Sequence, residues 1–166
     1  KLKFVILTGA RAPSMDLAAL TARGIPVSNT GTGGSSAPTA ELTWAVLMDA
    51  VRHVTAGDRL VRKGGWHKGL PMGFALEGKR LGVLGLGKLG SRVAGYGKAF
   101  GMEVVAWSQN LTAEKAAEHG AKLVSKDELL ASSDVITIHL ILSGRTRGLI
   151  GAADIAKMKK GVVLVN

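Results

Sequence analysis

Residues 81–90 read LGVLGLGKLG, a short apolar run that breaks into a G-x-G-x-x-G pattern at Gly85, Gly87 and Gly90. Between a strand and a helix, the first glycine permits a sharp turn, the second lets backbone approach a pyrophosphate, and the third lets the helix pack closely on the strand. The helix start would point its N–H groups and positive dipole end at the phosphates. Because glycines also mark ordinary turns, the neighbouring sequence decides whether the pattern indicates a dinucleotide-binding turn. Here an apolar run precedes the pattern, and a second one follows at 104–107.

Apolar runs alternate with helix-compatible segments through residues 78–166. The runs are mostly continuous, as strands of a parallel sheet covered on both faces require. A helix is expected at 88–100, and Ser125 with Glu128 forms a capping box before another helix. The pattern predicts an α/β fold, a doubly wound parallel sheet of the Rossmann type. We expect its strands at 81–84, 104–107, 122–124, 135–139 and 162–165.

The N-terminal part predicts a smaller unit. A strand at 4–7, a helix at 16–22 and a strand at 25–27 form one parallel strand–helix–strand unit, which is expected to be part of a second α/β domain. The stretch NTGTGGSS at 29–36 could be a second phosphate loop, but no useful apolar strand enters it, and a hinge or crossover is the better interpretation.

A long helix is expected from residue 38 to about residue 62, followed by an irregular loop at 66–77. Its apolar residues follow helical spacing and form one stripe, which could be core or a surface that faces a partner. The stripe consists of Trp44, Leu47, Met48, Val51 and Val54.

The composition excludes several classes of protein. Apolar residues make up 46% of the 166, which is a globular composition, and the absence of cysteine excludes disulfides and is compatible with the cytoplasm. The net charge of +10 could suggest nucleic acid, but the basic residues are scattered and not interleaved with aromatics. We therefore expect no nucleic-acid partner, and no apolar stretch predicts a membrane span.

The chain starts without methionine, inside an expected strand, and stops after another, so we expect an internal segment of a longer protein.

Four segments occur in an order that resembles the D-isomer-specific 2-hydroxyacid dehydrogenases, the family of phosphoglycerate dehydrogenase and hydroxypyruvate reductase. They are APTAELTWAVLMDAVR (37–52), GKRLGVLGLGKLG (78–90), SSDVITIHLILSGRTRGLIG (132–151) and MKKGVVLVN (158–166). The resemblance implies an NAD(P)-dependent oxidoreductase with two domains. Residues 1–37 would then belong to a substrate domain, 38–77 would be an interdomain helix and loop that contribute to a homodimer, and 78–166 would be the nucleotide domain.

The resemblance also implies the residues of the site. The loop of Gly9, Ala10 and Arg11 would bind the carboxylate of the substrate, although Arg11 stands where a small residue is usual and could be an ordinary surface arginine. Ile141 stands where proline is common. The residues implied to bind NAD or NADP are Gly85, Gly87, Lys88, Leu89, Gly90, Ser108, Gln109, His139, Leu140, Ile141, Thr146 and Asn166.

Cofactor preference stays open at the sequence level. Ser108 stands where NAD-preferring sites carry an acid that binds the ribose hydroxyls, and a neutral residue removes the repulsion of a 2′-phosphate. No arginine follows Ser108 directly, so NADP is permitted but not demanded. Arg145 and Arg147 could contact phosphate or could simply be exposed.

In the family, an arginine holds the substrate, a histidine is the general acid or base, and a glutamate sets the pKa of that histidine. The resemblance places all three beyond Asn166, so no catalytic residue and no metal ligand is assigned here. We expect the segment alone to be inactive. A non-catalytic dinucleotide sensor or corepressor on the same fold is the alternative, because fold does not fix function.

Overall fold

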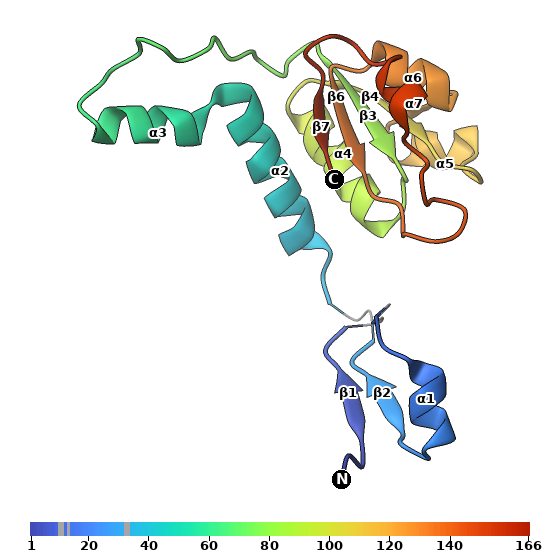
Figure 1. The fold of residues 1–166 in the computed structure, drawn as a ribbon. Helices are drawn as coiled ribbons and strands as arrows, with labels where there is room; N and C mark the ends of the chain where they lie inside the picture. The colour runs from blue at the N-terminus through green and yellow to red at the C-terminus, as the bar shows by residue number, and fades with distance from the viewer. Residues whose placement is uncertain (10–11, 13, 32–33) are drawn as a thin grey trace. The chain divides into compact units, whose positions relative to one another are not determined.

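The structure is a computed structural model that describes residues 1–9, 12, 14–31 and 34–166. The chain divides into two compact units, Lys1–Ser35 and Ser36–Asn166, which Figure 1 draws as a ribbon. Each unit has its own parallel sheet, of two strands in the first and five in the second.

The first unit is the predicted parallel strand–helix–strand. Strand β1 (Val5–Leu7) pairs in parallel with β2 (Val27–Asn29), and α1 (Leu17–Ala22) connects them. The helix begins where Asp16 Oδ1 accepts a hydrogen bond from the Ala19 amide at 2.9 Å, an N-cap that satisfies one of the free donors of the first turn. The second strand starts two residues later than the sequence predicted.

The second unit is built on a parallel sheet whose strands lie in the order β5-β4-β3-β6-β7. The chain runs outward from β3 through β4 to β5, returns to place β6 beside β3, and continues to β7. This order confirms the doubly wound parallel sheet. The strands are β3 (Arg80–Leu84), β4 (Glu103–Trp107), β5 (Lys122–Leu123), β6 (Val135–Ile138) and β7 (Val163–Val165).

Helices cover both faces of this sheet (Figure 1). Successive strand residues point to opposite faces, so β3 sends Leu81 and Val83 into one core and Leu84 into the other. On the first face pack α2 (Ala37–Arg52), α4 (Lys88–Ala99) and α5 (Ala113–Glu118). On the other packs α6 (Lys126–Ser132), and α7 (Ala152–Ile155) lies against α6. Burial on both faces explains why the strands read as continuous apolar runs.

The long helix that the sequence predicted is interrupted. It ends as α2, passes through His53 in the left-handed region (φ 55°), and restarts as α3 (Val54–Arg62). In a continuous helix the Thr55 amide would donate to the Val51 carbonyl. Here that amide donates to Asp49 Oδ1 at 2.6 Å, and the carbonyl accepts from the Phe74 amide at 3.1 Å instead.

The interruption also divides the predicted apolar stripe. Trp44, Leu47 and Val51 are buried on α2, where the Trp44 ring packs against Tyr96 at a centroid distance of 6.1 Å. Val54 lies beyond the break and is exposed. The α2 part of the stripe is therefore core, and α3 buries none of its residues.

Candidate functional site

The glycine turn after β3 has no room for a side chain at two of its positions, Gly85 and Gly90. Gly85 has φ 96° and donates from its amide to the Trp107 carbonyl at 2.9 Å. A Cβ atom at Gly85 would lie 2.9 Å from Leu140 Cδ2 and 3.0 Å from the His139 carbonyl oxygen, and one at Gly90 would collide with the carbonyl oxygen of Gly85. The first and third glycines are thus required by close packing, as the pattern predicts.

The N-cap position of α4 has open space beside its backbone. Gly87 is the N-cap residue and provides no side-chain cap, and a Cβ atom placed on it would meet nothing within 4 Å. The first amide bonded within the helix is that of Ser91, which donates to the Gly87 carbonyl at 2.9 Å. The Leu89 side chain packs into the core, so only its backbone belongs to this surface. An uncapped helix start with room above it fits an anionic diphosphate.

The turn lies where the strand order reverses. Strands β3 and β6 are neighbours, and the connections that leave them run to opposite sides of the sheet. In open α/β sheets, ligands bind in the crevice outside the carboxyl ends of strands at such a point. Gly85, Ser108, His139 and Asn166 each follow one of the strands β3, β4, β6 and β7 at this edge.

Two cavities at this edge bring several predicted residues together. One, of about 380 Å³, contains Gln109, Leu140 and Thr146 in its wall. The other, of about 300 Å³, contains Leu140, Thr146 and Asn166. The loop after β6 therefore contributes to both cavities, while the loop after β4 contributes to the first and the end of β7 to the second.

Thr146 fixes the shape of the loop after β6. Its hydroxyl accepts from the Ser143 amide at 2.8 Å and donates to the Ile141 carbonyl at 2.7 Å. Ile141 is exposed, and Leu140 and Leu142 are apolar residues of this loop that line the second cavity. The structure thus gives Thr146 a role within the loop, which the sequence did not indicate.

Lys126 supports the far wall of both cavities from α6. Its Nζ donates to the Leu149 carbonyl at 3.0 Å and pairs with Asp154 Oδ1 at 2.7 Å. The hydrogen bond from Lys126, with a second from the Gly151 amide, lowers the pKa of Asp154. The helix is capped by Ser125, whose hydroxyl accepts from the amide of residue 128 at 3.1 Å, the Ser125 half of the predicted capping box.

His139 continues β6 beside the glycine turn, and its amide donates to the Leu84 carbonyl at 2.8 Å. Its Nε2 atom is buried and has no hydrogen-bond partner among the residues that the structure describes. Burial lowers the pKa of His139 below its ordinary value of 6.5, so the ring is neutral at neutral pH. A buried nitrogen without a partner, next to the turn, is consistent with a site that a bound group completes.

The other predicted residues have separate positions. Ser108 is half-buried just after β4, and its carbonyl accepts from the Leu111 amide at 3.2 Å. Gly9 lies in the first unit, and Ala10 and Arg11 lie outside the described residues.

Sequence reasoning missed Trp107 and Leu149 in the cavity walls. The last residue of a strand at the carboxyl edge is a signal that could have found Trp107, but no pattern marked Leu149.

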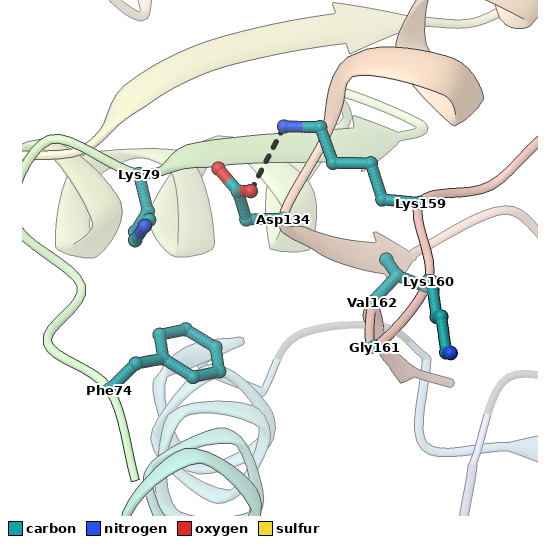
Figure 2. Close-up of a pocket in the computed structure, with 7 residues that line it drawn as sticks. All are labelled: Phe74, Lys79, Asp134, Lys159, Lys160, Gly161 and Val162. Atoms are coloured by element: carbon teal, nitrogen blue, oxygen red, sulfur yellow. Dashed lines mark hydrogen bonds and ion pairs between the residues drawn. The ribbon is translucent and has the colours of Figure 1, made fainter.

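A further hollow, of about 230 Å³, lies at the opposite edge of the sheet (Figure 2). Lys79, Asp134 and Val162 directly precede β3, β6 and β7, so this hollow is at the amino ends of the strands. In Figure 2 Asp134 lies between Lys79 and Lys159 and pairs with Lys159 at 2.9 Å. The crevice expected to bind the cofactor lies at the carboxyl ends of the strands, so we do not assign this hollow to the cofactor.

The described residues, 1–9, 12, 14–31 and 34–166, include no helix with both the length and the apolar composition of a membrane span. They also contain no group of three or more His, Cys, Asp or Glu side chains arranged to hold a metal ion.

Sequence comparison identifies relatives along the whole chain. Residues 44–166 match the model of the D-isomer specific 2-hydroxyacid dehydrogenase NAD binding domain. A glyoxylate reductase of Aeropyrum pernix is 41% identical over 100% of this chain and 51% of its own length. A D-3-phosphoglycerate dehydrogenase of Archaeoglobus fulgidus is 43% identical over 99% of this chain and 31% of its own length. The chain thus spans about half or less of these relatives.

Solved structures give the same result. A phosphoglycerate oxidoreductase from Vibrio cholerae superposes with a TM-score of 0.92 at 34% identity, over 99% of this chain and 52% of that one. A D-lactate dehydrogenase from Aquifex aeolicus, solved in complex with NAD and lactic acid, superposes with a TM-score of 0.82 at 32% identity, over 99% of this chain and 49% of that one. The chain belongs to the D-isomer-specific 2-hydroxyacid dehydrogenase family, and its residues 44–166 match the NAD-binding domain of that family.

Proposed function

We propose that the protein is an NAD(P)-dependent oxidoreductase that interconverts a D-2-hydroxy acid and a 2-keto acid by hydride transfer. The observation that carries the proposal is the glycine turn at the reversal of strand order, where the N-cap residue of α4, Gly87, provides no side-chain cap and has open space beside it. The relatives named above, a reductase and dehydrogenases, support an enzyme. No observation favours the non-catalytic sensor.

In this proposal each predicted residue has a defined task. Backbone amides from Gly85 to Gly90 bind the diphosphate, with Lys88 and Leu89 in the first turn of α4. Ser108 and Gln109 bind the adenosine half, Leu140, Ile141 and Thr146 lie between the halves, and His139 and Asn166 border the nicotinamide end. The bound dinucleotide supplies the carbon that gives or takes the hydride. The apolar walls exclude water, and the fixed loop after β6 orients the ring.

The division into domains is part of the same proposal. Residues 1–37 would belong to the substrate domain, where Gly9, Ala10 and Arg11 bind the carboxylate, and 38–77 would connect it to the nucleotide domain at 78–166. The separate packing of the unit Lys1–Ser35 supports this division. The catalytic arginine, glutamate and histidine are placed in parts of the protein other than this chain.

An assay of the intact protein tests the function. With NADH or NADPH, the protein is expected to reduce at least one of glyoxylate, hydroxypyruvate and pyruvate, as loss of reduced-nicotinamide absorbance. The same preparation is titrated with each dinucleotide by calorimetry. If the dinucleotide binds but no 2-keto acid in a broad panel is turned over, the non-catalytic sensor is favoured over the enzyme. If neither dinucleotide binds, both functions are refuted.

We also propose that the protein forms a homodimer through α3 and the loop after it. All of α3 is unburied, and the following loop carries Trp66 and Met72 with exposed fractions of 75% and 96%. A second copy is the occupant that the family resemblance implies for this surface. Trp66→Ser is expected to shift the protein toward monomer in sedimentation velocity. Ile155→Ser, at an exposed apolar side chain on α7, is the matched control and should leave the assembly unchanged.

The remaining partners follow from the same function. We propose a small 2-keto or 2-hydroxy acid as substrate, a cytoplasmic location, and neither nucleic acid nor membrane as partner. The scattered placement of the 22 basic residues supports the absence of a nucleic-acid surface. Cell fractionation tests the location, and a salt-dependent affinity for duplex DNA in the micromolar range would contradict the partner assignment.

A further inference from the structure

We propose that the site prefers NADP(H), and that Arg145 is the residue that binds the 2′-phosphate. The inference rests on the proposed function, because it concerns the adenosine half of the same cofactor site. It goes further by choosing between the two dinucleotides and by assigning the choice to one side chain in the loop after β6.

The first support is the chemistry at the end of β4. NAD-preferring sites place an acidic side chain there, which binds the ribose hydroxyls and repels a 2′-phosphate. This chain has Ser108 and then Gln109, both neutral. The nearest following acid, Glu114, is in the first turn of α5, where its own backbone amide and the Thr112 side chain lower its pKa. Its carboxylate is thus engaged at the start of its own helix.

The second support is the composition of the cavity beside this strand end. Among the described residues, the lining of the 380 Å³ cavity contains one charged side chain, that of Arg145, and no carboxylate. The other lining residues are Trp107, Gln109, Leu140, Thr146 and Leu149. The cavity therefore combines apolar walls that suit a base with one cation, at the strand end where the 2′ position of a dinucleotide lies in this fold.

The third support is that Arg145 is available and held in place. Within the described part of the chain, its guanidinium makes no hydrogen bond or ion pair. The turn that carries it is closed by Ser143 and Thr146: the Thr146 amide donates to the Ser143 carbonyl at 3.2 Å and the Arg147 amide to the same carbonyl at 2.9 Å. An unpaired guanidinium can bind a phosphate bidentately, and the closed turn already fixes the backbone that carries it.

Calorimetry on the intact protein tests the assignment with fragments that differ only in the 2′-phosphate, adenosine 2′,5′-bisphosphate and 5′-AMP. A charge-assisted contact predicts that the bisphosphate binds at least about tenfold more tightly in the wild type, and that Arg145→Ala removes that advantage. Affinity for 5′-AMP should change less than about twofold, since the variant leaves the diphosphate turn intact. Ser108→Asp should favour NADH over NADPH.

Arg147→Ala is the matched control, because it removes the same charge from the same loop at a residue that does not line the cavity. Its affinity for the bisphosphate should stay near that of the wild type. Equal affinity of the wild type for the two fragments, or equal losses in both arginine variants, would overturn the assignment while leaving the proposed function intact. Failure to bind either NADH or NADPH would overturn both.

Discussion

Gly90 and Gly95 lie on the same helix, α4, but their surroundings differ. A Cβ atom at Gly90 would collide with the Gly85 carbonyl oxygen, whereas one at Gly95 would meet nothing within 4 Å. We predict that Gly90→Ala destabilises the protein by about 1–3 kcal/mol, because α4 must move away from the turn. It should also weaken dinucleotide binding. Urea denaturation and calorimetric titration measure the two effects.

Gly95→Ala is the control for helix propensity. It should stabilise the protein by about 0.5–1 kcal/mol, because alanine loses less backbone entropy in a helix than glycine does. Equal effects of the two substitutions, in either direction, would show that α4 does not rest on the turn as described.

At the residue scale, the sequence identified the turn but not the roles of the loops around it. The three glycines carry their own steric requirement, so their pattern is readable. The function of Thr146 depends on which backbone groups lie within reach after folding, and no spacing in the sequence shows its bonds to residues 141 and 143. The buried Nε2 of His139 is likewise a consequence of packing.

At the scale of elements, the sequence predicted the positions of strands well and one helix poorly. Residues 38–62 have helical spacing of apolar side chains throughout, so periodicity alone indicates one helix. The break depends on competition for two backbone groups, the amide of Thr55 and the carbonyl of Val51. The amide donates to the side chain of Asp49, and the carbonyl accepts from the amide of Phe74, a residue of the following loop. Such tertiary competition is invisible to a local pattern.

The break makes a prediction about His53. It is the one residue other than glycine with a positive φ among those described, and this conformation costs an L-residue about 1–2 kcal/mol. We therefore expect His53→Gly to stabilise the protein by about 1 kcal/mol in urea denaturation. In a continuous helix the same substitution would destabilise by about the same amount. The sign of the change thus distinguishes the broken helix from the continuous one.

At the scale of the whole second unit, the alternation of strands and helices was enough to predict the architecture. Right-handed connections leave few ways to arrange such a chain, and the reversal of strand order follows from them. The cofactor site is then expected at the carboxyl ends of the strands. The interactions that connect the amino ends of the strands were not predicted. They depend on one charged side chain, that of Asp134, and the sequence around it was interpreted only as an apolar strand.

Asp134 connects the amino ends of three strands. Its carboxylate accepts from the Arg80 amide at 2.8 Å and pairs with Lys159 at 2.9 Å, and its carbonyl accepts from the Val163 amide at 3.1 Å. Burial by itself would raise the pKa of Asp134, but the hydrogen bonds from Arg80 and Lys159 outweigh it and hold the pKa below the ordinary 3.8. The side chain of Asp134 is 26% exposed, so the pair is partly shielded from solvent.

We predict that Asp134→Asn lowers the free energy of unfolding at pH 7 by about 1–2 kcal/mol. Because the folded pKa is depressed, this contribution is complete above pH 3.8 and is lost as pH falls through the folded value. The difference between variant and wild type in urea denaturation should therefore be constant from pH 7 to about 5 and shrink below 3.8. Asp58→Asn, at an exposed pair with Arg62, should change stability little at any pH. A difference that persists undiminished at the acid end would mean that packing, and not the charge of Asp134, joins the strands.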